Sequence, residues 1–148
     1  MYFIEDEHGM AEGKDVAGSL DRILGYLGED GEFSVHFVTD DEIKALNRDY
    51  RDKDEPTDIL TFRILDGEEF PSFPGEEKEL GDMFISMDAM RRNAAEFSVS
   101  EDEELFRLLV HGILHLQGYD HKTNDFSSEP MLMRQEEIIR ALFPGGMA

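Results

Sequence analysis

The sequence indicates one α+β domain, in which a small mixed β-sheet is covered by helices packed around a buried central helix. Apolar residues recur at helical spacing in five stretches, and short apolar or alternating runs between them indicate four strands. No internal repeat or linker divides these stretches. With 148 residues and 40% hydrophobic content, the chain can bury one core. We therefore expect residues 1–148 to form a single domain.

The expected elements follow one another closely along the chain. Short strands are expected at residues 2–4, 33–37, 57–64 and 80–85. Helices are expected at residues 16–27, 40–51, 87–97, 101–116 and 130–143. Residues 66–79 are acidic and contain two prolines and two glycines, which predicts a surface excursion between the last two strands.

Local signals mark where several of these helices begin and end. Thr39 and Ser100 are each followed three residues later by glutamate, so both are expected to open a helix with a capping box. Ser86 is a further N-cap candidate, and Gly28 is expected to end the first helix. Ser127 or Ser128 precedes the last helix, whose first turn holds Pro130.

The composition limits the classes of function. The net charge of −21, from 14 basic and 35 acidic residues, repels nucleic acid at long range. A function on nucleic acid therefore needs a local basic patch. The strongest candidate is the face shared by Lys44, Arg48 and Arg51, with Lys53 just beyond.

The compartment is expected to be the cytoplasm. The absence of cysteine excludes disulfides, thiolate zinc fingers and cysteine nucleophiles, and suits a reducing environment. No basic segment followed by an apolar run marks a signal peptide near residue 1. No apolar stretch is long enough to cross a bilayer, so no membrane partner is expected.

The strongest functional signal is the stretch from residue 111 to residue 121. His111 and His115 lie one turn apart on one face of a helix that is apolar nearly all round, and buried histidines need partners. Gly118 allows a left-handed turn that brings His121 to face them. Three neutral imidazoles with an open fourth position describe a zinc site with one ion per chain, which can activate water.

Two other interpretations of the histidines stay open. A structural zinc would need a fourth ligand, which Asp120 can supply, although its place beside His121 also suits a hydrogen-bond partner. The histidine spacing is that of the metzincin proteases, but these need a glutamate directly after the first histidine. Here that residue is Gly112, which weakens the protease interpretation and serves close packing or leaves room for substrate.

Residues 111–121 resemble the H-G-x-L-H-L-x-G-Y-D-H signature of the YbeY family. The members of this family are bacterial endoribonucleases that act in rRNA maturation. Residues 46–62 are similar to the family's L-N-x-x-Y-R-x-K-D-x-P-T-D-V-L-S-F segment, with Ile59 for Val and Thr61 for Ser. Residues 81–86 are similar to its G-D-I-x-I-S strand. With the helix patterns between them, these stretches extend the resemblance over nearly the whole chain.

The resemblance implies a zinc-dependent α+β hydrolase in which His111, His115 and His121 hold the metal. It implies single-strand-specific RNA cleavage that matures the 3′ end of small-subunit rRNA and removes defective ribosomes. The implied partners are single-stranded rRNA and the small ribosomal subunit, with its proteins or an assembly GTPase, and not DNA. An arginine that is important in the family falls on Arg51.

Arg51 and His111 are therefore the expected catalytic residues. A guanidinium can hold a phosphate with two hydrogen bonds and stabilise charge that develops in the reaction. The other expected substrate-binding residues are Lys44, Arg48 and Lys53. The general base stays unassigned, with Asp58 and Asp82 as candidates for which structural roles are more common.

Two alternatives to the nuclease remain. One is a zinc hydrolase of peptides or small molecules, which needs a carboxylate beside the metal-activated water. The other is a ribosome-assembly factor in which zinc is mainly structural, which predicts a closed site with four protein ligands.

Overall fold

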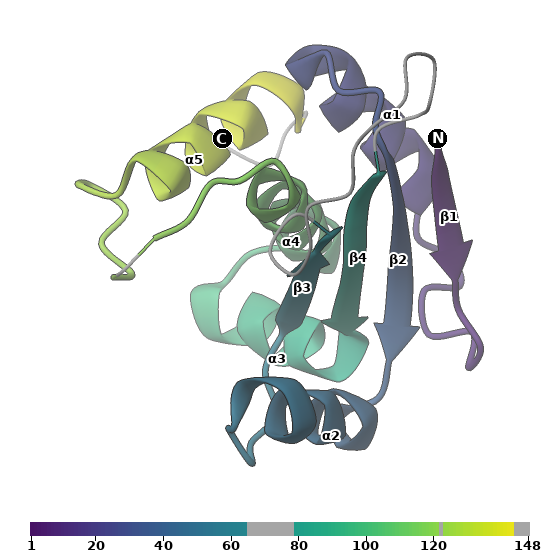
Figure 1. The fold of residues 1–148 in the computed structure, drawn as a ribbon. Coiled ribbons are helices and arrows are strands. Elements are labelled where there is room, and N and C mark those ends of the chain that lie inside the picture. Colours follow the sequence, from purple (N-terminus) through teal and green to yellow (C-terminus); the bar gives the residue numbers. More distant parts are fainter. Residues whose placement is uncertain (65–78, 122, 144–148) are drawn as a thin grey trace.

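The computed structural model describes residues 1–64, 79–121 and 123–143 (Figure 1). Its elements are β1 (Tyr2–Glu5), α1 (Val16–Leu27), β2 (Glu32–Val38), α2 (Asp40–Arg51), β3 (Ile59–Arg63), β4 (Glu79–Ser86), α3 (Met87–Phe97), α4 (Glu101–Leu116) and α5 (Pro130–Leu142). Every expected strand and helix is present. The acidic excursion predicted at residues 66–79 lies, up to residue 78, outside the described residues.

The four strands form one sheet in the order β1-β2-β4-β3. The pairs β1–β2 and β2–β4 are parallel, whereas β3 runs antiparallel to β4 at the edge of the sheet. The sheet is therefore mixed, and the predicted α+β class is confirmed. Thr61 of β3 is paired with Met83 of β4, so their side chains point to the same face of the sheet.

Helix α4 is the centre of the core. It packs against α1, α3 and α5 as well as against β3 and β4. Four of its side chains have no exposed surface, namely Leu109, Val110, Ile113 and Leu114. Figure 1 shows α1, α3 and α4 on one side of the sheet and α2 at the end where β2 finishes. The predicted buried central helix is confirmed.

The predicted N-cap residues are confirmed in three helices, and the predicted capping box is complete in one of the two places where it was expected. Thr39 opens α2 with a complete capping box, and Ser86 caps α3 by accepting from the backbone N–H of Ala89. Ser100 accepts from the N–H of Glu103, but the Glu103 carboxylate accepts from Arg107 instead of returning to the cap. One of the two bonds of the expected capping box is therefore replaced by the contact between Glu103 and Arg107.

Helix α5 begins at the predicted proline and without a side-chain cap. Pro130 is its first residue, as expected, but the N-cap is Glu129, whose side chain makes no capping bond. The hydroxyls of Ser127 and Ser128 both donate to the Asp125 carboxylate, so neither serine caps the helix. Among the described residues, no helix combines the length and apolar character needed to cross a membrane.

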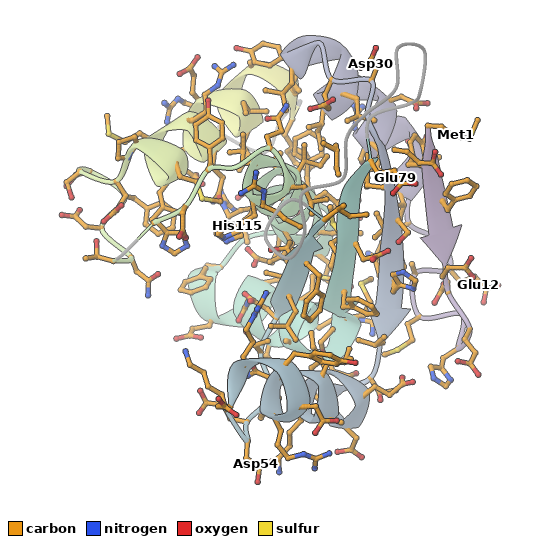
Figure 2. All side chains as sticks on the ribbon, viewed as in Figure 1. Met1, Glu12, Asp30, Asp54, Glu79 and His115 are labelled. Atoms are coloured by element: carbon orange, nitrogen blue, oxygen red, sulfur yellow. The ribbon has the colours of Figure 1, made fainter. Side chains whose placement is uncertain are left out.

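The C-terminal end of α4 lies in the middle of the molecule. Figure 2 shows the His115 side chain between β3 and the segment that leads to α5. Side chains from an edge strand, the central helix and a connecting segment therefore meet at this point, where the candidate site lies.

Candidate metal centre and active site

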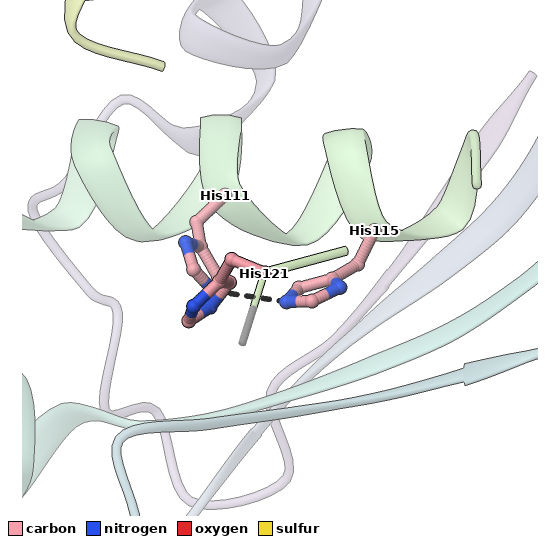
Figure 3. Close-up of side chains that lie close together, drawn as sticks. All are labelled: His111, His115 and His121. Carbon is pink, nitrogen blue, oxygen red and sulfur yellow. Dashed lines mark hydrogen bonds between the residues drawn. The ribbon is translucent and has the colours of Figure 1, made fainter. Parts of the chain in front are cut away.

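Three histidines meet at the end of α4 and form what we call the histidine cluster, His111, His115 and His121 (Figure 3). After Leu116 the chain turns at Gly118, whose φ of +107° is rarely adopted by residues with side chains. This turn brings His121 back against the helix. One ring nitrogen from each histidine lies within 4.8 Å of the other two.

Each ring of the histidine cluster directs its Nδ1 atom at an oxygen acceptor. The acceptors are Gln135 Oε1, Tyr119 O and Thr123 O, at 2.6, 3.1 and 2.7 Å from Nδ1 of His111, His115 and His121 respectively. A carbonyl oxygen can only accept, so each Nδ1 carries the hydrogen and each Nε2 presents a lone pair. In all three rings Nε2 is therefore the atom that is available to bind a cation.

The spacing of these nitrogens fits a bound metal ion. The Nε2 atoms of His111 and His115 are 3.1 Å apart, along the dashed line in Figure 3. Two neutral nitrogens that both present lone pairs cannot share a hydrogen bond at this distance. Two imidazoles on one tetrahedral zinc ion have their nitrogens about 3.3 Å apart. The donor set therefore fits a transition-metal ion with a fourth position open.

The protonation states of the rings also suit metal binding. Burial, together with the nearby rings of His111 and His121, lowers the pKa of His115 to about 4. Burial and the ring of His121 lower the pKa of His111 as well, against the effect of the hydrogen bond that His111 donates to Gln135. Both rings are thus neutral near pH 7, which is the state that binds a metal ion.

Gly112 is explained by close packing. A Cβ atom at this position would lie 2.8 Å from Sδ of Met83 and 3.0 Å from Cδ1 of Ile59. Helix α4 thus packs so closely on β3 and β4 that a larger residue at this position would have to displace the Met83 and Ile59 side chains. A glutamate here, as in a metzincin, would need that displacement, so the packing disfavours the protease interpretation.

Two cavities meet at the histidine cluster, and His111 and His115 line both. We call the smaller one, of about 460 Å³, the arginine cavity because Arg51 and Arg63 line it. The other, of about 980 Å³, we call the large cavity; it extends to α3 and α5 and is also lined by His121. The open side of the cluster is therefore accessible to a substrate from two directions.

The comparison with known proteins decides the family. The sequence matches the family model of endoribonuclease YbeY over residues 11–143. The chain belongs to the YbeY endoribonuclease family. The resemblance that the three motifs indicated is thus confirmed.

Individual relatives agree with the family match. The endoribonuclease YbeY of Lacticaseibacillus casei is 44% identical over 117 residues, which are 78% of this chain and 76% of that protein. The endoribonuclease YbeY of Halalkalibacterium halodurans is 46% identical over 114 residues, covering 74% and 71%. A solution structure of a Thermotoga maritima protein matches 95% of this chain and 87% of its own, with 31% identity and a TM-score of 0.60.

In this YbeY-family chain, Arg51 is fixed at the wall of the arginine cavity. Its Nη2 donates to the carbonyl of Thr61 at 2.7 Å, and its guanidinium lies 4.8 Å from the ring centre of Phe62. Arg63 lines the same cavity and was not selected from the sequence. Arg63 lies two residues beyond Thr61 on β3, so the two side chains point to the same face of the sheet, and this alternation is the sequence signal that could have identified Arg63.

The other predicted basic residues are placed differently. Lys53 lines the large cavity. Lys44 and Arg48 are exposed on α2 and line neither cavity, and Arg48 contacts the Asp49 carboxylate at 3.0 Å. The structure thus brings Arg51 and Lys53, of the four, to the cavities beside the histidine cluster.

The three acidic candidates also differ in their position relative to the histidine cluster. Asp82 lies on the face of β4 opposite to Met83, accepts from Ser34 Oγ and is directed away from the histidine cluster. Asp58 lines the large cavity, where its Oδ2 accepts from Asn93 Nδ2 at 3.0 Å. The Asp120 carboxylate accepts from the backbone N–H of His121 at 2.8 Å. Asp120 thus acts as a hydrogen-bond partner for the turn.

Proposed function

We propose that this chain is a zinc-dependent, single-strand-specific endoribonuclease that matures the 3′ end of small-subunit rRNA and acts in ribosome quality control in the cytoplasm. The observation that carries the proposal is the convergence of three Nε2 lone pairs beside the cavity in which Arg51 is fixed. Membership of the YbeY endoribonuclease family supports the reaction class.

The histidine cluster would hold one zinc ion per chain. When bound, such an ion supplies positive charge to the scissile phosphate and lowers the pKa of a water molecule. The bonds from the three Nδ1 atoms to Gln135, Tyr119 and Thr123 fix the ring orientations, which preorganises the site. His111 is central because it lines both cavities and is tied to α5 through Gln135.

Arg51 would bind the scissile phosphate and stabilise charge during its hydrolysis. One N–H of its guanidinium is used by Thr61, and the fork has five donors, so others are available for phosphate oxygens. The stacking on Phe62 restricts the guanidinium, which lowers the entropy lost on binding. Lys53 would contact the neighbouring RNA backbone, with Lys44 and Arg48 as outer contacts.

The charge of −21 favours delivery of the RNA by a partner. We place that role with the small ribosomal subunit, through its proteins or an assembly GTPase. A basic partner would offset the long-range repulsion between this chain and rRNA.

The rival functions are less favoured by the geometry. A structural zinc is typically enclosed by four protein ligands, whereas the ligand group in the described part of the chain has three members and borders two cavities. A peptide hydrolase of the metzincin type needs a base at residue 112, where a larger side chain would have to displace Met83.

The test is cleavage of a single-stranded rRNA fragment and of its duplex by protein of known zinc content. We expect cleavage of the single strand only, with activity that follows zinc content and is lost in His115→Ala and after chelation. Equal cleavage by wild-type and His115→Ala proteins would identify a contaminating nuclease and move the assembly-factor function to the front.

A further inference from the structure

Two exposed phenylalanine rings line the large cavity beside the histidine cluster. Phe97 ends α3 and is 62% exposed, and Phe126 precedes α5 and is 49% exposed. A phenylalanine on a cavity wall with about half of its surface or more in water contributes little to the core. The two rings come from segments far apart in sequence, yet both border the cavity that His111, His115 and His121 also line.

Apart from Lys53, which we place against the RNA backbone, the charged groups that line this cavity are largely paired with one another. Arg107 contacts Glu136 at 3.0 Å and Glu104 at 3.6 Å. The amide of Asn93 lies between two carboxylates, with its Nδ2 at 3.0 Å from Asp58 Oδ2 and 3.4 Å from Glu104 Oε2. The acidic side chains on this wall would also repel a phosphate. The large cavity therefore suits an uncharged, flat group better than an anion.

The arginine cavity has the opposite character. Arg51 is held at its wall by Thr61, and Arg63 lines it from the same strand. The histidine cluster thus lies between one cavity suited to phosphate and another suited to aromatic groups. A nucleotide offers both groups, because its phosphate and its base lie on opposite sides of the sugar.

We propose that Phe97 and Phe126 stack on unpaired nucleobases of the RNA that flank the scissile phosphate, while Arg51 holds that phosphate. This inference rests on the proposed endoribonuclease function and names the subsite that makes it single-strand-specific. Aromatic side chains stack on any base, so the subsite selects unpaired bases and not a sequence. A paired base is kept in its helix by stacking and pairing, and entry into the cavity would require that it be flipped out.

The experiment compares Phe97→Ala and Phe126→Ala with Phe3→Ala as the matched control. Phe3 is 46% exposed on β1 and lines neither cavity. Zinc-loaded proteins are titrated into a labelled single-stranded fragment of small-subunit rRNA, and binding is followed by fluorescence anisotropy and cleavage under single-turnover conditions. Zinc content and thermal unfolding of each variant check that the fold is intact.

We expect each cavity variant to weaken RNA binding at least about fivefold, and Phe3→Ala to leave it within about twofold. Leucine at either position keeps apolar bulk without a flat ring, so Phe97→Leu and Phe126→Leu should bind as weakly as the alanine variants. An abasic site is then placed at each nucleotide of the RNA in turn. Near the cleavage site, it should weaken binding by the wild type. It should not weaken binding by the double variant that carries both Phe97→Ala and Phe126→Ala.

The outcomes separate this inference from the proposed function. If the wild type cleaves the RNA but the alanine variants bind as tightly as it does, the stacking subsite is wrong and the nuclease stands. The subsite is also wrong if the alanine variants lose affinity equally for intact and abasic RNA. It is wrong as well if the leucine variants bind RNA as tightly as the wild type, because apolar bulk without a flat ring would then be sufficient. A wild type that neither binds nor cleaves single-stranded RNA overturns both proposals.

Discussion

The Gln135 side-chain oxygen lies 2.6 Å from Nδ1 of His111, which ties α5 to the histidine cluster on α4. Gln135 is only 2% exposed, and its amide orientation is set because Nε2 donates to Glu136 at 3.0 Å. Glu136 in turn accepts two hydrogen bonds from Arg107. The direction of the His111 lone pair therefore depends on a chain of contacts between the two helices.

Removing this acceptor should weaken metal binding without removing a ligand. Gln135→Leu leaves the buried Nδ1–H of His111 without its partner, and loss of such partners typically lowers metal affinity about 10- to 100-fold. We expect that loss in a zinc titration against a competing chelator. Gln117→Leu is the control, since Gln117 donates to Glu29 outside both cavities. Unchanged zinc affinity in a folded Gln135→Leu protein would remove Gln135 from the site.

Arg51 should affect the chemical step and leave the metal in place. We expect Arg51→Ala to slow single-turnover RNA cleavage about 100- to 1,000-fold, the usual cost of losing one group that stabilises transition-state charge. Zinc content should stay unchanged. Arg51→Lys should not restore the rate, because an ammonium group lacks the planar fork that Thr61 and Phe62 hold.

The control for this prediction is Arg134→Ala on α5, where Arg134 contacts Glu137 at 2.7 Å and lines neither cavity. A wild-type cleavage rate for Arg51→Ala at saturating protein would show that Arg51 serves the fold or the encounter with RNA, and not the reaction.

Local sequence signals predicted the elements and the histidine cluster because both depend on short-range geometry. The capping residues Thr39 and Ser86 act within one helical turn, so their roles follow from the sequence around them. The meeting of His111, His115 and His121 needs only helical spacing and the turn at Gly118. Neither serine before α5 caps that helix, because Asp125 accepts from both hydroxyls.

The remainder of the site is assembled by long-range packing. Gln135 is an unremarkable polar residue in its own helix and reaches His111 only because α5 packs on α4. Phe97 and Phe126 share a cavity that the order of elements in the sequence does not define. Asp58 and Asp82 both stand in matched motifs, and only the folded structure separates them, because Asp58 lines the large cavity whereas Asp82 lies on the face of β4 opposite to Met83.

Asp40 predicts a pH-dependent contribution to stability. Its carboxylate accepts from Arg92 Nη1 at 2.7 Å and from Ser86 Oγ at 2.8 Å, which links the start of α2 to α3. The bond from Arg92 lowers the pKa of Asp40, helped by Ser86 and opposed by partial burial. Because the folded-state pKa is below that of the unfolded chain, the ionised form stabilises the fold above about pH 4, and this is lost as pH falls.

The measurement is urea unfolding of the wild type and Asp40→Asn at several pH values. We expect the variant to be less stable by about 1 kcal/mol near pH 7, given the exposed Arg92 partner. The difference should shrink as pH falls below about 4. Asp41→Asn, at the next and exposed position, controls for charge at the helix start. A difference that is the same at every pH would mean that the carboxylate charge is not involved.

The close packing around Gly112 is what disfavours the metzincin interpretation relative to the nuclease. We expect Gly112→Ala to lower the free energy of unfolding by about 1 kcal/mol, because Met83 and Ile59 must move within a close-packed layer. This is the net effect after the gain of about 1 kcal/mol in helix propensity. Gly25→Ala in α1 is the matched control, since nothing lies within 4 Å of its added Cβ. That variant should be more stable than the wild type.

The Gly112→Glu variant tests whether the same packing also prevents peptide hydrolysis. The larger side chain would clash with Met83 and Ile59, so it cannot reach the open position of the histidine cluster without displacing these buried contacts between α4 and the sheet. We expect a strongly destabilised protein with no peptide hydrolysis. Denaturant unfolding and a peptide-cleavage assay measure both results. A stable Gly112→Glu variant that cleaves peptides would show that α4 can move away from the sheet, and the peptide hydrolase would again compete with the nuclease.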